Sequence, residues 1–225
     1  MIKRWYHFIL AVFAAYRYGF PGKQLTVIGV TGTDGKTTTT NLLYEILREH
    51  LGKTSMISTV GAVIGGKVSD TGFHVTTPDA NSVQKYLREM VDHGDRYCVL
   101  EVTSHALDQY RVWGIPFRLA VLTNITHEHL DYHKTFREYQ NTKFSLLNMA
   151  PVAVVNLDDK GSGDFLNTRY RGKIRTYSKK QKADVTPAKF PIHSPLPGDY
   201  NLENCLAALC AAMELGVDAQ GAIST

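Results

Sequence analysis

A glycine-rich loop that carries one lysine and a run of threonines is the segment best suited to chemistry. The sequence GVTGTDGKTTTT, residues Gly29–Thr40, follows a short apolar run and precedes a stretch with helical periodicity. Gly32 and Gly35 let the backbone turn tightly, so that N–H groups and the N-terminus of the following helix face a phosphate. Lys36 would reach the β- and γ-phosphates, and the Thr37 hydroxyl would hold Mg²⁺. The spacing departs from the strict Gly-x4-Gly-Lys pattern, but the strand-loop-helix context predicts a nucleotide site; a threonine-capped helix start is the alternative.

A glutamate at the end of a second apolar run could complete a metal site. Glu101 lies in the run Tyr97–Val102, and the carboxyl ends of strands form the edge where open α/β sheets bind ligands. An unpaired carboxylate there would be costly without a cation, so Glu101 is expected to share a metal ion with Thr37. Its pairing with a surface lysine is the alternative. Hydrogen-bonding side chains follow, including one guanidinium suited to a carboxylate or phosphate: Thr103, Ser104, His105, Gln109 and Arg111.

A third polar segment, NITHEHLDYH at residues 124–133, contains three histidines and two acidic residues. Its spacing lacks the His-Glu-x-x-His pattern of zinc-binding helices and no cysteine lies nearby in the sequence, so zinc is disfavoured. Mg²⁺ prefers oxygen ligands and retains several waters. One histidine beside carboxylates is therefore an unusual but acceptable ligand at a second metal position.

The elements that must position these residues alternate along the chain. Strands are expected over the apolar runs 25–30, 55–64, 97–102, 119–123 and 152–156, and helices over 36–50, 82–93, 135–149 and 202–215. This alternation predicts an α/β fold with a mostly parallel sheet flanked by helices. Residues 179–197 are rich in lysine and proline, so a surface crossing or linker is expected there.

Composition limits the class of protein. With 225 residues, 44% of them hydrophobic and 20% charged, the chain can form one large globular domain or two small ones. The balance of 25 basic against 21 acidic residues is too even to indicate nucleic acid as a partner, whereas a small anionic ligand is compatible with it. The three cysteines include no Cys-x-x-Cys pair, which favours a reducing cytoplasm and free thiols in packed positions.

Residues 5–16 form an apolar run, which Lys3 and Arg4 precede and Arg17 closes. The run is too short to span a bilayer, which disfavours an export signal or a transmembrane helix. Apolar residues at helical spacing predict an amphipathic helix packed on the domain or on a partner, and a helix in the membrane interface is the alternative. These residues are Ile2, Trp5, Tyr6, Ile9, Leu10, Phe13 and Tyr16.

Four motifs in this order resemble those of the Mur ligases, most closely the MurE class, which acts on UDP-N-acetylmuramoyl-dipeptide. GTDGKTTT resembles the family's Gly-Thr-Asn-Gly-Lys-Thr loop, with Asp34 in place of asparagine. TTPD at Thr76–Asp79 resembles a substrate-contacting segment, and EVTSHAL at Glu101–Leu107 resembles Glu-Val-Ser-Ser-His-Ala-Leu. NITHEHLDYH resembles Asn-Ile-x-x-Asp-His-Leu-Asp. Because the resemblance spans nearly all of residues 25–218, it implies the P-loop NTPase-like central domain of these ligases.

The resemblance implies roles for single residues. Thr37 and Glu101 would hold one Mg²⁺, and His129 and Lys143 a second. Lys143 matches the lysine that the family carbamylates with CO₂, which converts a cation into a carboxylate-like ligand; from the sequence pattern alone it would be an exposed helix residue. The implied sets are, for catalysis, Lys36, Glu101, His129 and Lys143; for ATP, Gly32, Thr33, Asp34, Gly35, Lys36, Thr37, Thr38, Asn201 and Asn204; for the muramoyl-peptide, Thr76, Thr77, Thr103, Gln109 and Arg111.

The implied activity is ATP-dependent ligation of an amino acid to UDP-N-acetylmuramoyl-dipeptide through an acyl phosphate, in peptidoglycan precursor synthesis. The resemblance divides the chain into a helix and linker, residues 1–22, and a central ATP-binding domain, residues 23–225. The family's uridine-binding and C-terminal domains are expected to lie outside this chain, and the isolated chain is expected to be an inactive fragment. Two alternatives stay open: a non-catalytic ATP-binding module or scaffold, and a related ligase with another substrate.

Overall fold

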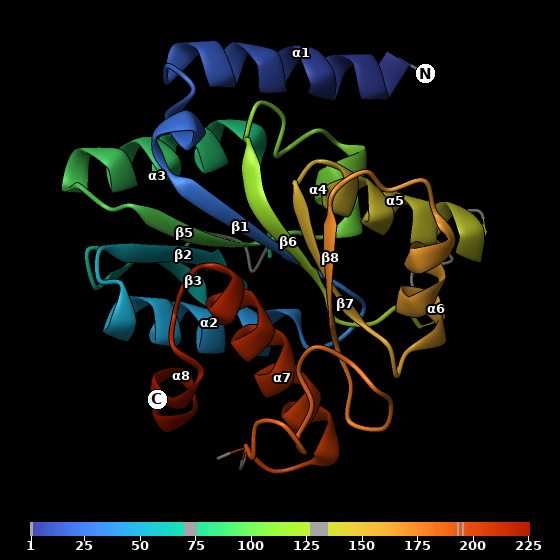
Figure 1. The fold of residues 1–225 in the computed structure, drawn as a ribbon. Coiled ribbons are helices and arrows are strands. Elements are labelled where there is room, and N and C mark those ends of the chain that lie inside the picture. Colours follow the sequence, from blue (N-terminus) through green and yellow to red (C-terminus); the bar gives the residue numbers. More distant parts are fainter. Residues whose placement is uncertain (1, 70–75, 127–134, 193, 195) are drawn as a thin grey trace.

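The computed structural model describes residues 2–69, 76–126, 135–192, 194 and 196–225. Its centre is an eight-stranded sheet in the order β4-β3-β2-β5-β1-β6-β7-β8 (Figure 1). The strands are β1 (Thr26–Thr31), β2 (Thr54–Ser58), β3 (Gly61–Ile64), β4 (Lys67–Ser69), β5 (Tyr97–Glu101), β6 (Phe117–Leu122), β7 (Val152–Asn156) and β8 (Lys173–Tyr177). Six of them run parallel, and β3 and β4 join one edge as an antiparallel extension.

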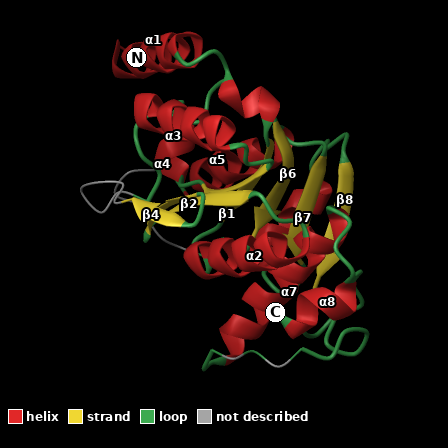
Figure 2. Cartoon of the chain, turned by 90° about the vertical axis from the view of Figure 1, so that its left-hand side faces the viewer, coloured by secondary structure: helices red, strands yellow, loops and turns green. Residues whose placement is uncertain are grey.

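Helices cover both faces of the sheet. They are α1 (Ile2–Arg17), α2 (Lys36–His50), α3 (Ala80–His93), α4 (Ser104–Asp108), α5 (Phe136–Asn148), α6 (Lys160–Gly163), α7 (Asp199–Glu214) and α8 (Ala219–Ser224), with 3-10 turns at Pro21–Gln24 and Asp164–Asn167. Helices α3, α4 and α5 lie on one face, whereas α2, α7 and α8 lie on the other (Figures 1 and 2). The fold is therefore a three-layer α/β sandwich, as the alternating pattern predicted.

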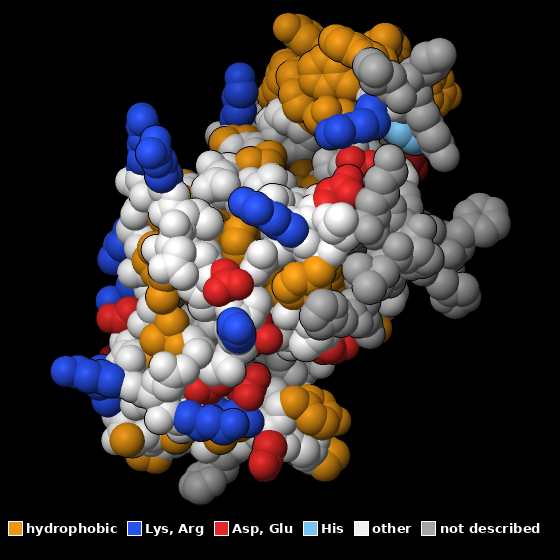
Figure 3. Space-filling model, turned by 90° about the vertical axis from the view of Figure 1, so that its right-hand side faces the viewer, with side chains coloured by type: hydrophobic (Ala, Val, Ile, Leu, Met, Phe, Trp, Pro, Cys, Tyr) orange, Lys and Arg blue, Asp and Glu red, His pale blue; other side chains and the backbone are white. Residues whose placement is uncertain are grey.

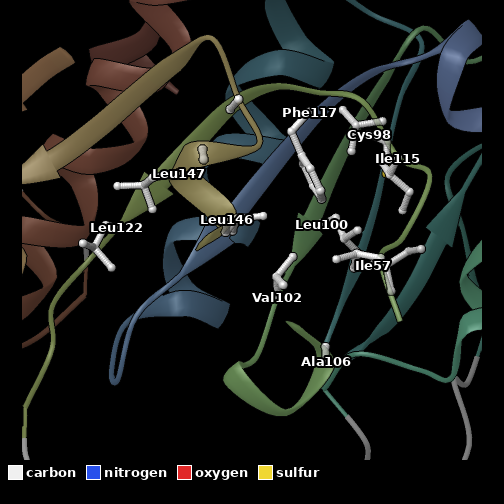
Figure 4. Packing of buried hydrophobic residues seen from close by; sticks show 14 of the residues in the cluster. Ile57, Cys98, Leu100, Val102, Ala106, Ile115, Phe117, Leu122, Leu146 and Leu147 are labelled. Atoms are coloured by element: carbon white, nitrogen blue, oxygen red, sulfur yellow. The ribbon is translucent and has the colours of Figure 1, made fainter. Parts of the chain in front are cut away.

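The two buried clusters explain why these segments take up their positions. Strand β1 contributes Val27 to the cluster under α3 and α5, and its neighbour Ile28 to the cluster under α2 and α7. Successive strand residues point to opposite faces, so a strand covered on both sides must be apolar throughout. Figure 4 shows the first cluster, where Leu146 and Leu147 of α5 pack over strand residues that include Leu100.

The structure differs from the sequence-based expectation at both edges of the sheet. The apolar run 55–64 was predicted as one strand, but Gly61 has a φ of 138° and the chain reverses at residues 59–60, forming β2 and β3. Strands β4 and β8 were not predicted, because edge strands with exposed charged residues carry little hydrophobic signal. Within 179–197, the described residues form no helix or strand beyond one isolated bridge at Val185, so the segment is irregular as expected for a crossing or linker, although Ala183, Val185 and Thr186 are buried.

The predicted N-terminal helix is present and packs on the domain, and it does so through small residues rather than through its large apolar ones. Helix α1 contacts α3 and is the outermost element above it (Figure 1). It buries the small residues Ala11, Ala14 and Ala15, and Phe8 packs edge-on against Trp113 with the ring centroids 5.7 Å apart. The large apolar residues of the opposite face remain exposed. Among the described residues, no helix combines the length and apolarity needed to cross a membrane.

The prediction of free, packed cysteines is confirmed. Cys98, Cys205 and Cys210 are all buried and unbonded to one another. Burial raises the pKa of the Cys98 thiol and raises that of Cys210 to about 12. Such thiols remain protonated and are poor nucleophiles, so their role is packing in the core rather than catalysis.

Candidate active site

The predicted phosphate loop leaves the carboxyl end of β1 and enters α2. Gly32 has a φ of 154° and Gly35 a φ of 75°, conformations that side-chain-bearing residues rarely adopt. A Cβ on Gly32 would collide with the Thr123 hydroxyl, and one on Gly35 with the Asn204 amide oxygen. Both glycines are therefore required by close approach as well as by backbone conformation.

The end of β6 holds the loop in place from beside it. The Asp34 N–H donates to Oδ1 of Asn124 at 2.8 Å, and the Thr123 hydroxyl donates to the Asp34 carbonyl at 2.6 Å. Nζ of Lys36 donates to the Thr33 carbonyl at 2.7 Å, so the lysine lies along the loop. A lysine on a glycine-rich loop that leads into a helix N-terminus is the arrangement that binds a polyphosphate.

Substitutions at two glycines test whether the close approach of Gly35 to Asn204 is needed for nucleotide binding. Gly35→Ala and Gly52→Ala each place alanine at a left-handed φ, 75° and 64°, but a Cβ at Gly52 meets no atom within 4 Å. Each substitution should lower the free energy of unfolding by about 1–2 kcal/mol. Only Gly35→Ala must also displace Asn204, so we expect its affinity for Mg²⁺·ATP to fall at least about tenfold, whereas Gly52→Ala should bind as wild type. Urea unfolding and calorimetric titration measure the two effects; equal losses of affinity would contradict the role of Gly35.

The hydroxyl of Thr37 and the carboxylate of Glu101 come together as predicted. Thr37 Oγ1 lies 2.9 Å from Oε1 and 3.1 Å from Oε2 of Glu101. Thr59, at the end of β2, also donates to Oε2, through its N–H at 3.0 Å and its hydroxyl at 3.1 Å. Thr59 was missed from the sequence because its turn lay inside a segment predicted as continuous strand.

The donor set around Glu101 fits a divalent cation such as Mg²⁺. The Glu101 side chain is only 1% exposed, and its described hydrogen-bond donors are neutral hydroxyl and amide groups. A buried carboxylate without a positive partner is costly, and hard cations prefer carboxylate and hydroxyl oxygens. The expected pairing of Thr37 and Glu101 at a metal is thus chemically consistent with the geometry.

Lys143 is buried rather than exposed, which corrects the reading from helical pattern alone. It lies on α5, is 2% exposed, and donates from Nζ to the Gly32 carbonyl at 2.6 Å. Nζ also lies 4.4 Å from the centroid of the Tyr139 ring. The Tyr139 hydroxyl is 3.2 Å from Oγ1 of Thr33, so α5 contacts the phosphate loop at two points. Lysines are seldom fully buried unless they are paired, and the bond to Gly32 fixes this one at the loop.

The residues expected to hold a substrate gather around Thr77. Its hydroxyl donates to the Glu101 carbonyl at 2.9 Å and accepts from the Thr103 N–H at 3.1 Å. Nη1 of Arg111 donates to the Thr77 carbonyl at 2.5 Å, and Gln109 Oε1 accepts from the same guanidinium at 2.8 and 3.1 Å. Thr76 extends the cluster, because its hydroxyl oxygen lies 3.0 Å from that of Thr59. The cluster therefore adjoins the Glu101 carboxylate directly.

A cavity of about 500 Å³ opens on the other side of the loop. It is lined by Asp34, Gly35, Thr38, Thr123, Asn124, Tyr177, Tyr200, Glu203 and Asn204. Asn204 is oriented by Asn201, whose Oδ1 accepts from its Nδ2 at 3.1 Å, and Asn201 in turn donates to the Pro197 carbonyl at 2.7 Å. Asn204 therefore lines the cavity, whereas Asn201 holds it in position. The size and polar lining suit a nucleoside.

Tyr177 and Glu203 line this cavity and were missed from the sequence. Burial, with a smaller contribution from nearby Glu203, raises the pKa of Tyr177 well above its ordinary value, so its hydroxyl stays protonated. That hydroxyl donates to the Thr123 carbonyl at 3.2 Å. Tyr177 ends β8, the strand that the sequence did not reveal, and no motif singled it out.

The histidine segment falls outside the described residues. His129, predicted as a metal ligand, lies there with the other two histidines of the segment. The remaining predicted positions form two groups beside one another: Lys36, Thr37, Glu101 and the Thr77 cluster, and the cavity with Asn204.

Comparisons with known proteins agree on one family. Residues 30–212 match the family model described as Mur ligase middle domain. The chain is 35% identical over 226 residues to the UDP-N-acetylmuramoyl-L-alanyl-D-glutamate--2,6-diaminopimelate ligase of Clostridium botulinum and 38% identical to that of Cytophaga hutchinsonii. These alignments cover 92% and 93% of this chain and 46% of each relative. The chain thus spans about half the length of the curated relatives it matches.

Solved structures give the same result. A ligase of the same printed name superposes with a TM-score of 0.78 at 32% identity, covering 89% of this chain and 45% of that one. MurF from Acinetobacter baumannii superposes with a TM-score of 0.72 at 21% identity, covering 97% and 49%, which supports the fold alone. The loop, the glutamate at the end of β5 and the cavity beside α7 thus occur in a fold shared with these ligases, and this chain belongs to the Mur ligase middle domain family.

Proposed function

We propose that this chain forms the ATP-binding and phosphoryl-transfer site of a ligase that adds an amino acid to UDP-N-acetylmuramoyl-dipeptide in peptidoglycan precursor synthesis. The observation that carries the proposal is the junction of the phosphate loop with a buried carboxylate: Thr37 Oγ1 lies 2.9 Å from Glu101 Oε1. The names of the relatives support this substrate class and point to 2,6-diaminopimelate as the amino acid. We place the enzyme in the cytoplasm, where its free cysteines would stay reduced.

The proposed site divides ATP between the two groups of residues. Asn204 and the cavity beside α7 bind the adenosine, while the loop from Gly32 to Thr38 encloses the phosphates. Asp34 lines the cavity and fixes the shape of the loop, since its N–H and carbonyl are held by Asn124 and Thr123. The Thr77 cluster, with the Arg111 guanidinium, positions the muramoyl-peptide carboxylate near the γ-phosphate.

The proposed reaction has two steps. A carboxylate oxygen of the dipeptide attacks the γ-phosphorus of ATP, and the bond from this phosphorus to the β–γ bridging oxygen breaks to release ADP. The amine of the incoming amino acid then attacks the acyl carbon, loses a proton, and expels phosphate as the amide forms. In the first step, Lys36 stabilises the negative charge that moves onto the departing ADP. The chain's role is positioning and electrostatics rather than covalent catalysis.

We propose two Mg²⁺ positions. Thr37 and Glu101 would hold the first, and Lys143 as a carbamate, with His129, the second. Mg²⁺ would neutralise charge on the transferring phosphoryl group. A carbamate forms when the neutral Nζ of Lys143 attacks CO₂ and loses a proton, and the product keeps one N–H that can still donate to the Gly32 carbonyl. Burial of Lys143 beside the loop supports this assignment.

The carbamate can be tested without measuring activity. Wild-type protein in ¹³C-bicarbonate should show one carbonyl signal in the ¹³C spectrum, lost on acidification because a protonated amine cannot retain CO₂. Lys143→Arg and Lys143→Met should lack the signal, and their turnover should fall at least about 100-fold, because even residues that merely orient metal ligands are worth about 10–100-fold. Lys160→Arg, on the short helix α6, is the matched control and should keep the signal. An unchanged signal in both Lys143 variants would contradict the assignment.

The ligase proposal itself is tested with the full-length gene product. ATP, UDP-N-acetylmuramoyl-dipeptide and a panel of amino acids that includes 2,6-diaminopimelate are supplied, and released phosphate and peptide product are measured. We expect phosphate release to require both dipeptide and amino acid. Release that is independent of both would contradict the proposal and favour a plain ATPase.

The division of the chain is also a proposal. Residues 23–225 would form the central ATP-binding domain, with the family's uridine-binding and C-terminal domains supplied outside this chain. Residues 1–22 would form a separate helix and linker. Because α1 exposes large apolar residues, we propose that residues 2–17 contact a partner or a membrane surface.

A further inference from the structure

The outward face of α1 exposes a set of large apolar side chains that the fold does not use. We call Trp5, Tyr6, Ile9, Leu10, Phe13 and Tyr16 the aromatic face; each is between 44% and 69% exposed. At 100° per residue these positions fall within an arc of about 140°. The space-filling view shows hydrophobic side chains gathered over α1 at the top of the molecule (Figure 3). Monomeric proteins rarely expose an apolar patch of this kind unless it binds something.

The arrangement is the reverse of an ordinary surface helix. Helix α1 packs on the domain through Ala11, Ala14 and Ala15, each at most 1% exposed, while its largest residues point outward. Small residues on the inner face let α1 lie close to α3. The domain therefore presents the aromatic face rather than covering it.

The charges of the segment limit what can cover this face. The sequence of α1 contains no aspartate or glutamate, and its cations lie near both ends: Lys3, Arg4 and Arg17. Arg4 is partly neutralised by Asp108 at 3.5 Å, whereas the Arg17 guanidinium carbon lies 5.7 Å from the Tyr18 ring centroid. An apolar stripe with flanking cations and no acids is complementary to an apolar surface with anionic groups at its border.

A second copy of the chain fits less well. Two α1 helices paired through their aromatic faces, parallel or antiparallel, would bring Arg17 near another cation with no acidic residue on either helix to compensate. Trp and Tyr, in contrast, favour the interface between lipid headgroups and acyl chains. With 16 residues, α1 is about 24 Å long, shorter than the ~30 Å hydrocarbon core, so it would lie on a bilayer.

We propose that α1 docks this protein on the surface of an anionic phospholipid bilayer. The helix lies in the interface, with the aromatic face toward the acyl chains and Arg17 near the phosphates. The phosphate loop joins β1 to α2, whereas α1 packs on α3, so docking leaves the loop accessible; α1 also contacts Asp108 and Tyr110, next to the Thr77 cluster, through Arg4. The aromatic face contains none of the residues of the proposed ligase site, so each proposal can fail without the other.

Vesicle binding by the 225-residue chain tests the proposal. Flotation compares phosphatidylcholine vesicles with vesicles that also contain phosphatidylglycerol. We expect binding to the anionic vesicles only, weakened by added salt because exposed charges are screened. The chain has two tryptophans, so Trp113→Phe leaves Trp5 as the single reporter, and its fluorescence should shift to shorter wavelength with anionic vesicles.

Matched double variants separate the aromatic face from general surface apolarity. Trp5→Ser with Phe13→Ser should weaken binding at least about tenfold for each side chain removed from lipid. Val68→Ser with Met149→Ser removes two exposed apolar side chains elsewhere, 72% and 41% exposed, and should bind as wild type. The circular dichroism spectra of both variants should match that of wild type, which checks that they fold.

Three results would overturn the proposal. The first is absence of binding to anionic vesicles, and the second is equal binding to both vesicle types. The third is a concentration-dependent dimer in lipid-free solution, seen by light scattering and abolished by the Trp5/Phe13 variant, because it would assign the aromatic face to a second copy. None of these results bears on ATP-dependent ligation, which is measured without lipid.

Discussion

Replacing Lys36 with alanine should lower ligase turnover about 100- to 1,000-fold while leaving the fold almost unchanged. Removing one preorganised group from developing transition-state charge typically costs about 2.7–4 kcal/mol. In this structure the Lys36 ammonium contacts the Thr33 carbonyl at 2.7 Å, inside the loop that would hold the β- and γ-phosphates. Its loss removes charge from the phosphate site but little packing, so the free energy of unfolding should change by less than about 0.5 kcal/mol.

Lys85→Ala is the control for Lys36→Ala. Lys85 is an exposed lysine of α3 that pairs with Glu89 at 3.6 Å across one helical turn, and such pairs contribute little. Steady-state phosphate release and calorimetric ATP binding are compared for the two variants and wild type. Lys36→Ala with wild-type turnover would contradict the assignment of the loop, and an equal loss in Lys85→Ala would point to a nonspecific effect.

Replacing Glu101 with glutamine should abolish the stabilisation that Mg²⁺ adds to bound ATP. For wild type, ligand at about 100 times its Kd should stabilise the fold by about 2.7 kcal/mol, or roughly 5–10 °C in Tm for a chain of this length. Glutamine keeps an oxygen that can accept from Thr37 and Thr59, but it removes the charge that binds the cation. Without Mg²⁺ the variant should be at least as stable as wild type, because a buried charge has been removed.

A second buried carboxylate provides the comparison. Asp95 is 7% exposed, accepts from the Ser55 hydroxyl, and precedes β5, at the opposite end of this strand from Glu101. Asp95→Asn should alter Tm with and without Mg²⁺·ATP by the same amount. Thermal unfolding with ATP plus chelator and with ATP plus Mg²⁺ separates the two contributions. A full Mg²⁺ response in Glu101→Gln would exclude this carboxylate as the ligand.

The central part of the fold could be predicted because its hydrophobic residues follow a clear pattern along the sequence. The inner strands β1, β5, β6 and β7 are covered on both faces, so they read as continuous apolar runs, and helices α2, α3, α5 and α7 keep a helical period. The edges could not be predicted in this way. Strand β8, KIRTY, has only one buried residue, and its position depends on pairing with β7 rather than on its own composition.

The site was predictable where a required backbone conformation or a charged residue at a strand end can be recognised in the sequence. Gly35 and Glu101 could be assigned from a turn and a strand end, before any geometry was known. Lys143 could not, because its position near the middle of helix α5 says nothing about burial; only the resemblance selected it. Thr59 and Tyr177 belong to the site through long-range pairing of the sheet, and a single sequence does not encode that pairing in any local pattern.

The N-terminal helix α1 shows what hydrophobic periodicity alone cannot predict. Periodicity located the apolar stripe of α1 correctly, but it could not say whether the domain or the surroundings cover it. The structure shows that the face with Ala11, Ala14 and Ala15 packs on the domain, because close helix packing on α3 needs small side chains. A hydrophobic stripe therefore identifies a binding face without identifying the surface that it binds.

The most direct test of the account follows one oxygen atom through the reaction. The dipeptide carboxylate is labelled with ¹⁸O, and the full-length gene product is supplied with ATP, Mg²⁺ and the amino acid. If the carboxylate attacks the γ-phosphorus and phosphate later leaves from the acyl carbon, each released phosphate should carry one ¹⁸O from a labelled carboxylate oxygen. Unlabelled phosphate released together with amide product would show that no acyl phosphate forms, and it would contradict the proposed role of this site.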